Sequence, residues 1–290
     1  MREPRNAQSV PVEASRRRLV DSEVSIELAS DQVREFSPDP HVLPVGSRVF
    51  LTHLKGKPLA SQVEAAKFLK EIGYVPVPHL GARNFDTTAD YVRQIESHSR
   101  NGVTEALFVG GNPLIAAGPL AQAAQLLAHP VLADSTIRVA FLGGYPEGHP
   151  AISQTELREV TSRKVTLCRE RGLAPHIVSQ FAFDGAAMGL WAKKLQLEYP
   201  DLPVRVGLAG VTSLPKLIKF AIMCGIGPSL AVLKNSHKGL FNVLADKDPA
   251  DVIEGIETNY AAPIGQLDLH FFPFGGWKKT LDWVAGSRRR

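Results

Sequence analysis

The chain has 290 residues, of which 44% are hydrophobic and 21% charged. This composition excludes a disordered or fibrous protein, and the length suits two small domains or one large α/β barrel. The 33 Lys and Arg residues outnumber the 29 Asp and Glu residues, which gives a formal net charge of +4. Arginine triplets at 16–18 and 288–290 are too short to indicate a nucleic-acid or membrane partner, so we expect neither; the charge excess would attract an anionic ligand.

The cysteines and histidines predict no metal site. Cys168 and Cys224 lack the spacing of metal ligands, and they are expected to be free thiols in a reducing compartment. The histidines are scattered, and no zinc motif, phosphate-binding Walker loop or Ser-His-Asp signature is present. No apolar run reaches membrane-spanning length and the polar N-terminus does not look like a secretory signal, so we expect a cytoplasmic protein.

Strand-like and helix-like segments alternate along most of the chain. Residues 1–20 are polar and are expected to form a flexible arm, with residues 21–290 as one domain. The predicted strands cover residues 24–28, 48–53, 74–79, 105–109, 137–142, 176–181, 204–208 and 267–272. The predicted helices cover residues 59–72, 86–100, 114–128 and 153–171, a segment ending at 197, and parts of 213–262.

Eight such units predict a closed (β/α)8 TIM barrel. A doubly wound open sheet is the rival fold, but it needs fewer strands. It also usually carries a glycine-rich fingerprint after its first strand. No such fingerprint follows residues 24–28.

The most informative segment follows the fifth predicted strand and reads Gly-Gly-Tyr-Pro-Glu-Gly-His-Pro over residues 143–150. A strand that stops at Gly-Gly and Pro passes into a turn. This turn carries Tyr145, Glu147 and His149, and barrels place their chemistry on loops of this kind. The alternative is an ordinary turn with a capping Glu and a surface His.

Polar groups also end most of the other predicted strands. Glu27 is either a general acid whose pKa an apolar barrel mouth would raise, or an outward-facing strand residue. His79 and His149 are either ligands or structural histidines, and Gln180 is either a contact residue or a sheet-edge amide. Phenylalanines at 181, 183, 271, 272 and 274 are either core or a surface on which a flat heteroaromatic ligand stacks.

In order, over about residues 22–280, these segments resemble the bacterial-type methylenetetrahydrofolate reductases, which are single flavin-carrying (β/α)8 barrels. The segment from Gly144 to Pro150 is close to the family's Tyr-Pro-Glu-x-His-Pro. Three further blocks match in the same order, namely Pro78-His79-Leu80, the Gln180–Asp184 segment and His270-Phe271-Phe272.

The resemblance implies an oxidoreductase of one-carbon metabolism and methionine biosynthesis that interconverts 5,10-methylenetetrahydrofolate and 5-methyltetrahydrofolate. FAD would be the cofactor, NADH or NADPH the co-substrate and tetrahydrofolate the substrate, in a homo-oligomer. Glu27 and Asn112 would be catalytic. Residues expected to bind cofactor are Thr52, His53, His79, Gly110, Gly111, Tyr145, Glu147, His149, Arg163 and Lys164. Residues expected to bind substrate are Gln180, Phe183, Phe220 and Phe274.

Several positions depart from the family pattern. Gly110-Gly111-Asn112 stands where the family has Arg-Gly-Asp, and Gly276 stands in place of an Arg. The pair Arg163-Lys164 could also be a solvent-facing stripe. Alternatives are therefore a flavin-independent enzyme with direct hydride transfer, an enzyme that oxidises methyltetrahydrofolate, and a non-catalytic folate- or flavin-binding subunit of a methyl-transfer (demethylation) system. A barrel lyase using Lys55 as a Schiff base ranks last.

Overall fold

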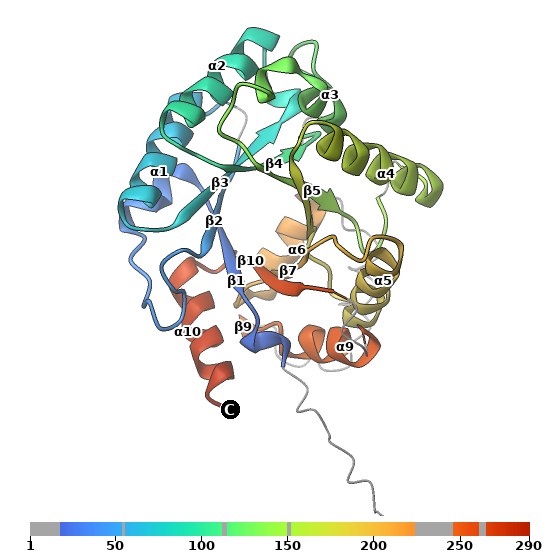
Figure 1. The fold of residues 1–290 in the computed structure, drawn as a ribbon. Coiled ribbons are helices and arrows are strands. Elements are labelled where there is room, and N and C mark those ends of the chain that lie inside the picture. The colour runs from blue at the N-terminus through green and yellow to red at the C-terminus, as the bar shows by residue number, and fades with distance from the viewer. Residues whose placement is uncertain (1–17, 54–55, 112–114, 150–151, 224–245, 261–264) are drawn as a thin grey trace, which may run out of the picture.

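A computed structural model describes residues 18–53, 56–111, 115–149, 152–223, 246–260 and 265–290 of the chain. Eight parallel strands close into a barrel in the order β1-β10-β7-β6-β5-β4-β3-β2, and helices surround it (Figure 1). The predicted (β/α)8 fold is therefore confirmed. The strands are β1 (Val24–Leu28), β2 (Arg48–Leu51), β3 (Val75–Gly81), β4 (Glu105–Val109), β5 (Val139–Gly144), β6 (Ala174–Ser179), β7 (Val204–Ala209) and β10 (Leu267–Phe272).

Eight α-helices lie within the described ranges. They are α1 (Leu59–Glu71), α2 (Thr88–Arg100), α3 (Ala123–Ala128), α4 (Gln154–Glu170), α5 (Gly185–Glu198), α6 (Leu214–Met223), α9 (Ala250–Tyr260) and α10 (Trp277–Arg288). Four short 3-10 turns accompany them, η1 (Leu19–Asp21), η2 (Ser30–Glu35), η3 (Ala82–Asn84) and η4 (Pro130–Leu132). No helix of the described ranges is long and apolar enough to cross a membrane.

The barrel has two apolar layers because its parallel strands are covered on both faces. Phe50, Val77, Leu107, Phe141 and Val178 fill the interior. A much larger cluster lies between the strands and the surrounding helices, and most of the buried aliphatic residues belong to it. Closure pairs the first strand with the last, so that Ser25 stands opposite His270 although 245 residues separate them. Barrel closure therefore brings side chains from the two ends of the sequence into contact inside the barrel.

Local capping signals set the starts of two helices. The Thr87 hydroxyl accepts a hydrogen bond from Asp90 N, and the Asp90 carboxylate accepts from Thr87 N in return. Ser153 and Glu156 form the same reciprocal arrangement ahead of α4. Such capping boxes satisfy backbone groups that a helix end leaves unpaired, and one cap contributes about 1 kcal/mol.

Several predicted boundaries were wrong, and packing explains two of them. Within the described residues 115–128, the predicted helix 114–128 is helical only over α3, because Pro119 and the close packing of Gly118 interrupt its first half; a Cβ on Gly118 would lie 2.1 Å from Asp86 O. The fifth strand does not stop before Gly143 but runs through Gly144. Gly144 suits a strand here because a Cβ would lie 2.6 Å from a ring atom of Trp191 in α5.

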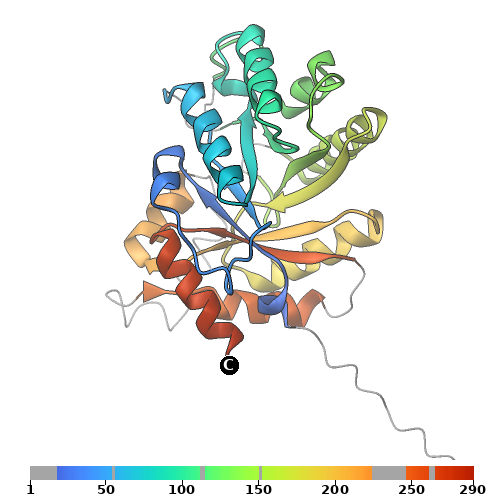
Figure 2. The same cartoon turned by 60° about the vertical axis from the view of Figure 1, so that its left-hand side comes forward.

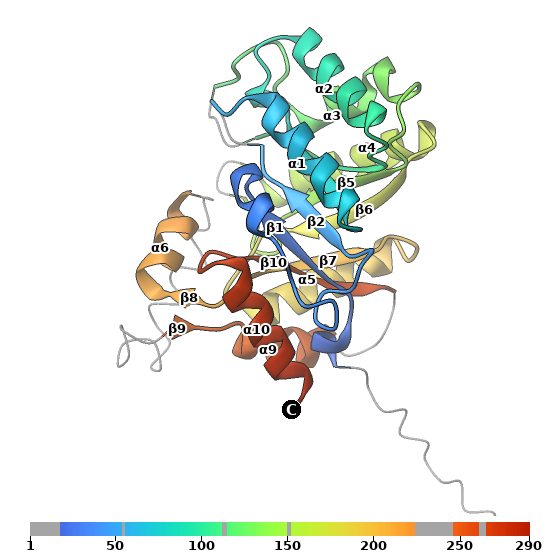
Figure 3. The same ribbon diagram turned by 90° about the vertical axis from the view of Figure 1, so that its left-hand side faces the viewer.

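Other features were not predicted. The short antiparallel pair β8 (Thr212–Ser213) and β9 (Asp246–Lys247) lies with α6 beside the barrel (Figure 3). Helix α10 packs across the outside of the barrel next to η1 (Figure 2). The expected arm lies mostly outside the described residues, while Leu19 and Val20 are buried in η1. The predicted helical stretch 213–262 lies partly outside them too.

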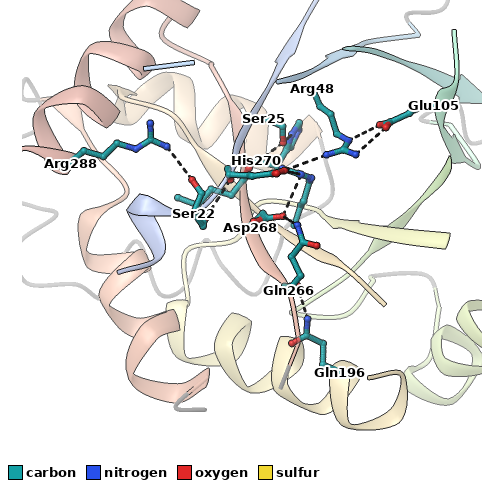
Figure 4. A network of polar contacts seen from close by, with 12 residues as sticks. Ser22, Ser25, Arg48, Glu105, Gln196, Gln266, Asp268, His270 and Arg288 are labelled. Carbon is teal, nitrogen blue, oxygen red and sulfur yellow. Dashed lines mark hydrogen bonds and ion pairs between the residues drawn. The ribbon is translucent and has the colours of Figure 1, made fainter. Parts of the chain in front are cut away.

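Charged side chains form the floor of the barrel, where the strands begin. Arg48 binds both carboxylate oxygens of Glu105, at 2.6 and 3.0 Å (Figure 4). Arg205, which is 3% exposed, contacts Glu23 at 2.6 Å and Asp268 at 3.4 Å. Both arginines of the floor therefore have an opposite charge beside them, which offsets the cost of removing them from water.

Candidate active site at the barrel mouth

A carboxyl group and two imidazoles meet inside the mouth, at the ends of three strands. Glu27 Oε2 lies 3.3 Å from His79 Nε2 and 3.9 Å from His270 Nε2. Alternate residues of a barrel strand point inward, and the contact with His79 shows that Glu27 is one of them. Of the two interpretations of Glu27, the inward-facing one is therefore the one observed.

The uncharged forms of these groups are favoured by burial. Burial raises the pKa of Glu27, and the nearby His79 only partly opposes this rise. Burial likewise lowers the pKa of His79 to about 4, although the Glu27 carboxylate favours its protonation. A carboxyl group that holds its proton in an apolar mouth is suited to general acid catalysis.

Three buried polar atoms around the mouth lack a hydrogen-bond partner among the described residues. They are Thr52 Oγ1, His79 Nε2 and Asn84 Oδ1. The 3.3 Å contact of His79 with Glu27 is not aligned as a hydrogen bond. Buried polar atoms are seldom left unpaired, so their gathering at the strand ends fits a ligand with complementary donors and acceptors. A flavin or pterin ring offers such groups along its edges.

His53 makes structural contacts. Its Nδ1 accepts a hydrogen bond from Gly81 N at 3.1 Å, and its carbonyl accepts from Asn84 Nδ2 at 2.7 Å. The ring packs against Phe85 at 4.9 Å, and burial lowers the His53 pKa to about 4. His53 thus ties the end of β2 to the end of β3 and helps to shape the mouth.

Arg83 is a mouth residue that the sequence analysis missed. Its backbone N–H donates to Gly110 O at 2.9 Å, and its side-chain Nε donates to Ala121 O at 3.1 Å. A Cβ on Gly110 would lie 3.5 Å from Arg83 Nη2, so the guanidinium lies over this glycine. The position, four residues after His79 at a strand end, was the signal available in the sequence. Asn112 lies outside the described residues, and so does Lys55.

The loop after β5 joins the mouth on the side of β6. The rings of Tyr145 and His149 meet edge to face at 5.2 Å. Gly148, with φ at +86°, turns the loop, and its N–H donates to Tyr145 O. Glu147 Oε1 accepts a hydrogen bond from the N–H of Asp184, the N-cap of α5.

The positive charge of Arg83 acts on this loop. Burial raises the pKa of Tyr145 while Arg83 opposes the rise. At His149, burial and Arg83 both lower the pKa. Arg83, Tyr145 and His149 therefore lie within electrostatic reach of one another, although they come from loops after different strands. This arrangement suits an anionic group of a ligand.

Aromatic rings that follow β6 and β10, together with a ring of α6, form an aromatic wall at the mouth. Phe220 and Phe274 stack at 4.0 Å with an interplanar angle of 12°. Phe181 contacts both Phe274 and Phe183, at 4.9 and 5.8 Å. Three predicted substrate-binding phenylalanines are thus brought together. Gln180 precedes the wall, and its Oε1 accepts from the N–H of Phe181.

Arg163 and Lys164 do not share a face of α4. Arg163 is exposed, whereas Lys164 is only 6% exposed and lies beside Cys168. Consecutive residues of a helix point about 100° apart, so the two cations are directed differently. Burial lowers the pKa of Lys164 to about 8, which makes its charge costly to keep.

We expect Lys164→Met to stabilise the protein below pH 8. The pKa of Lys164 falls from 10.5 to about 8 on folding, so the unfolded chain binds the proton more tightly. The resulting penalty is complete below pH 8 and disappears as the pH rises to 10.5. Methionine removes it, with a gain of about 3 kcal/mol at pH 6 in urea unfolding.

Arg163→Met is the matched control and should leave the free energy of unfolding unchanged, since Arg163 is exposed. If Lys164→Met lowers stability at pH 6, the buried ammonium has a stabilising partner and our expectation is wrong. Loss of ligand affinity in both variants would support the predicted role of the pair in binding phosphate.

A groove elsewhere on the molecule lacks the buried acid and the aromatic wall of the mouth. It lies between the segment 37–42 and α10, away from the strand ends, and its walls include Asp39, Trp277, Lys278 and Asp282. The mouth, by contrast, joins a buried acid, unpaired polar atoms and aromatic rings, which is the usual composition of a catalytic site.

No protein-family model matches the chain. A solved structure with the same barrel is an uncharacterized protein from Clostridium thermocellum that binds two copies of 5-methyl-5,6,7,8-tetrahydrofolic acid. It is 12% identical, with coverage of 92% of this chain and 93% of that chain and a TM-score of 0.60. A GH18 chitinase from Pseudoalteromonas aurantia is 13% identical, with coverage of 92% and 99% and a TM-score of 0.47. For the Clostridium thermocellum protein, an identity this low shows a shared fold and nothing finer.

Proposed function

We propose that the barrel mouth binds a reduced folate, and that the protein interconverts 5,10-methylenetetrahydrofolate and 5-methyltetrahydrofolate with NAD(P)H. The observation that carries the proposal is the Glu27 carboxyl group, which lies beside His79 and whose pKa is raised by burial. The motif resemblance and the folate bound by the Clostridium thermocellum barrel support the same ligand class.

Glu27 is the acid of the proposed reaction. It gives its proton to N10 of the folate, the bond between N10 and the bridging methylene carbon breaks, and a 5-iminium ion forms. Hydride derived from NAD(P)H then adds to that carbon and leaves a methyl group on N5. One proton and one hydride are consumed, NAD(P)⁺ is released, and Glu27 regains a proton from solvent.

The other mouth residues bind and orient in this proposal. The aromatic wall of Phe183, Phe220 and Phe274 stacks the pterin and keeps water away from the iminium carbon. Gln180 offers its amide at the edge of that wall. Arg83 attracts an anionic part of the folate or of the nucleotide toward Tyr145 and His149.

The mouth residues fit the heterocycle of FAD, which when bound would carry the hydride from NAD(P)H to the folate. Thr52 and His79 would hold its ring, because each has a buried polar atom without a hydrogen bond among the described residues. Gly110, Gly111, Tyr145, Glu147 and His149 would line the rest of the cofactor site.

Direct hydride transfer from NAD(P)H to the folate is the second candidate. It is favoured by the divergence of Arg163 and Lys164, which leaves the expected phosphate-binding pair on different faces of α4. Both candidates use Glu27 in the same way, and they differ in whether flavin is needed.

An absorbance spectrum and a turnover assay of the purified protein test the proposal. With bound flavin we expect a yellow protein, whose flavin bands NADH bleaches and methylenetetrahydrofolate restores. A colourless protein that oxidises NADH on adding methylenetetrahydrofolate would support direct transfer. Tight binding of 5-methyltetrahydrofolate in calorimetry, without turnover in either direction, would make it a binding subunit. No binding of either folate would overturn the proposal.

A further inference from the structure

Ser25 and His270 form a buried hydrogen-bonded pair directly below the mouth. They are partners in the register of β1 and β10, and Ser25 Oγ lies 3.0 Å from His270 Nδ1 (Figure 4). Their exposed fractions are 0% and 1%, so neither side chain contacts solvent. Proton positions within the pair are therefore decided by neighbouring protein atoms alone.

The carbonyl of Leu269 determines where the serine proton lies. Ser25 Oγ is 3.1 Å from Leu269 O, and a carbonyl oxygen can only accept a hydrogen bond. Both contacts of the hydroxyl are used only if its proton goes to Leu269 O and Oγ accepts from His270. His270 then carries its proton on Nδ1, and Nε2 keeps a bare lone pair.

That lone pair faces the carboxyl group of Glu27. His270 Nε2 lies 3.9 Å from Glu27 Oε2. The edge-to-face rings of Phe50, at 4.5 Å, and Phe272, at 4.8 Å, hold the imidazole plane in place. Burial disfavours a second proton on the ring, and the charge of Arg205 adds to this effect, so that the His270 pKa falls to about 3. The imidazole therefore stays neutral.

We propose that Ser25 and His270 are positioning residues that keep the proton on Glu27, because Ser25 selects the imidazole tautomer whose bare nitrogen faces the Glu27 carboxyl group. The proposal deepens the proposed function, since it names what makes Glu27 an acid. The catalytic role of the pair rests on the proposed function. The tautomer of His270 does not, because it is a property of the protein without substrate.

Electrostatics gives the direction of the effect. A lone pair repels a carboxylate and tolerates a carboxylic acid, whereas an N–H at the same place would stabilise the carboxylate. His79 from β3 and His270 from β10 are the titratable side chains of the described chain in ion-pair range of Glu27. Of these, His270 has its tautomer set by a hydrogen bond on its far nitrogen.

The tautomer can be measured in the unmodified protein. We expect ¹⁵N NMR of histidine-labelled protein at pH 7 to show His270 with a protonated Nδ1 and an unprotonated Nε2, with His270→Gln used to assign the signal. A proton on Nε2, or an imidazolium, would overturn the proposal. Because no substrate is present, this outcome is independent of whether the protein reduces folates.

Ser25→Ala tests the consequence for Glu27. Without the hydroxyl, His270 can place its proton on Nε2, so the pKa of Glu27 should fall by about one unit, a tenfold change in its ionisation constant. The fall is measured by ¹³C NMR of labelled glutamate. It should also appear as an equal downward move of the alkaline limb of kcat, since the acid must be protonated.

Ser179→Ala is the matched control. Ser179 is a buried strand serine of β6 whose Oγ accepts from Gly207 N and which contacts no histidine among the described residues. We expect it to leave the Glu27 titration and the alkaline limb in place. If Ser25→Ala lowers activity but moves neither the Glu27 titration nor the alkaline limb, the pair acts through packing alone and the proposal fails.

Discussion

Replacing Glu27 by Gln is expected to lower the rate of methylenetetrahydrofolate reduction by about 10²- to 10⁴-fold, the usual contribution of a positioned general acid. Glutamine has the size and shape of a protonated Glu, but its amide protons are not acidic enough to be transferred to N10. Because Glu27 carries no buried ion pair with an arginine or lysine among the described residues, the barrel should fold normally. The measurement is single-turnover kinetics with saturating folate and NADH.

The half-reactions and a surface control separate this role from a binding role. Folate affinity should change little in Glu27→Gln, and NADH should still reduce any bound flavin at an unchanged rate. Glu198→Gln, at the exposed C-terminal end of α5, should behave as the unmodified protein. Equal loss of folate reduction and of flavin reduction would remove Glu27 from the acid role.

Replacing Gly185 by Ala is expected to lower the free energy of unfolding by about 3 kcal/mol, the upper part of the range for an overpacked site. A Cβ on Gly185 would lie 2.2 Å from Val252 O in α9, and backbone cannot move aside as a side chain can. Gly189 and Gly255 lie in the same close approach of α5 and α9. Urea unfolding followed by circular dichroism measures the loss.

Gly286→Ala is the control for the chemical change itself. Gly286 lies in α10, with no atom within 4 Å of an added Cβ. We expect this variant to be more stable by about 0.5–1 kcal/mol, because alanine loses less backbone entropy than glycine in a helix. If Gly185→Ala were as stable as the unmodified protein, the two helices would not approach as closely as described.

Much of the local architecture follows from sequence patterns. β1 and β4 have the predicted bounds, and α1 and α2 differ from their predictions by only one or two residues. Thr87 and Ser153 mark helix starts through contacts three residues away, which a sequence displays directly. The failures came where distant packing overrides a local signal. Gly144 is tolerated in a strand because Trp191 occupies the space that a side chain at this position would need.

Some residues of the candidate site could also be predicted from the sequence, and others could not. The residue types at strand ends predicted Glu27, His79 and the Tyr145–His149 loop as mouth residues, because side-chain alternation and the position after a strand are local properties. Arg83 was missed because it matters only through its place over Gly110, on a different strand end. Lys164 looked like half of a basic pair, but the packing of α4 buries it beside Cys168.

The sequence by itself determined the number of β/α units, their order and the chemical groups that follow each strand, since these depend on periodicity and on neighbours a few residues away. Only the tertiary structure decided which groups meet. Closing the barrel puts β1 beside β10, so that Ser25 and His270 are hydrogen-bonded and His270 lies 3.9 Å from Glu27. Contacts across 245 residues depend on strand register and burial, which no local pattern contains.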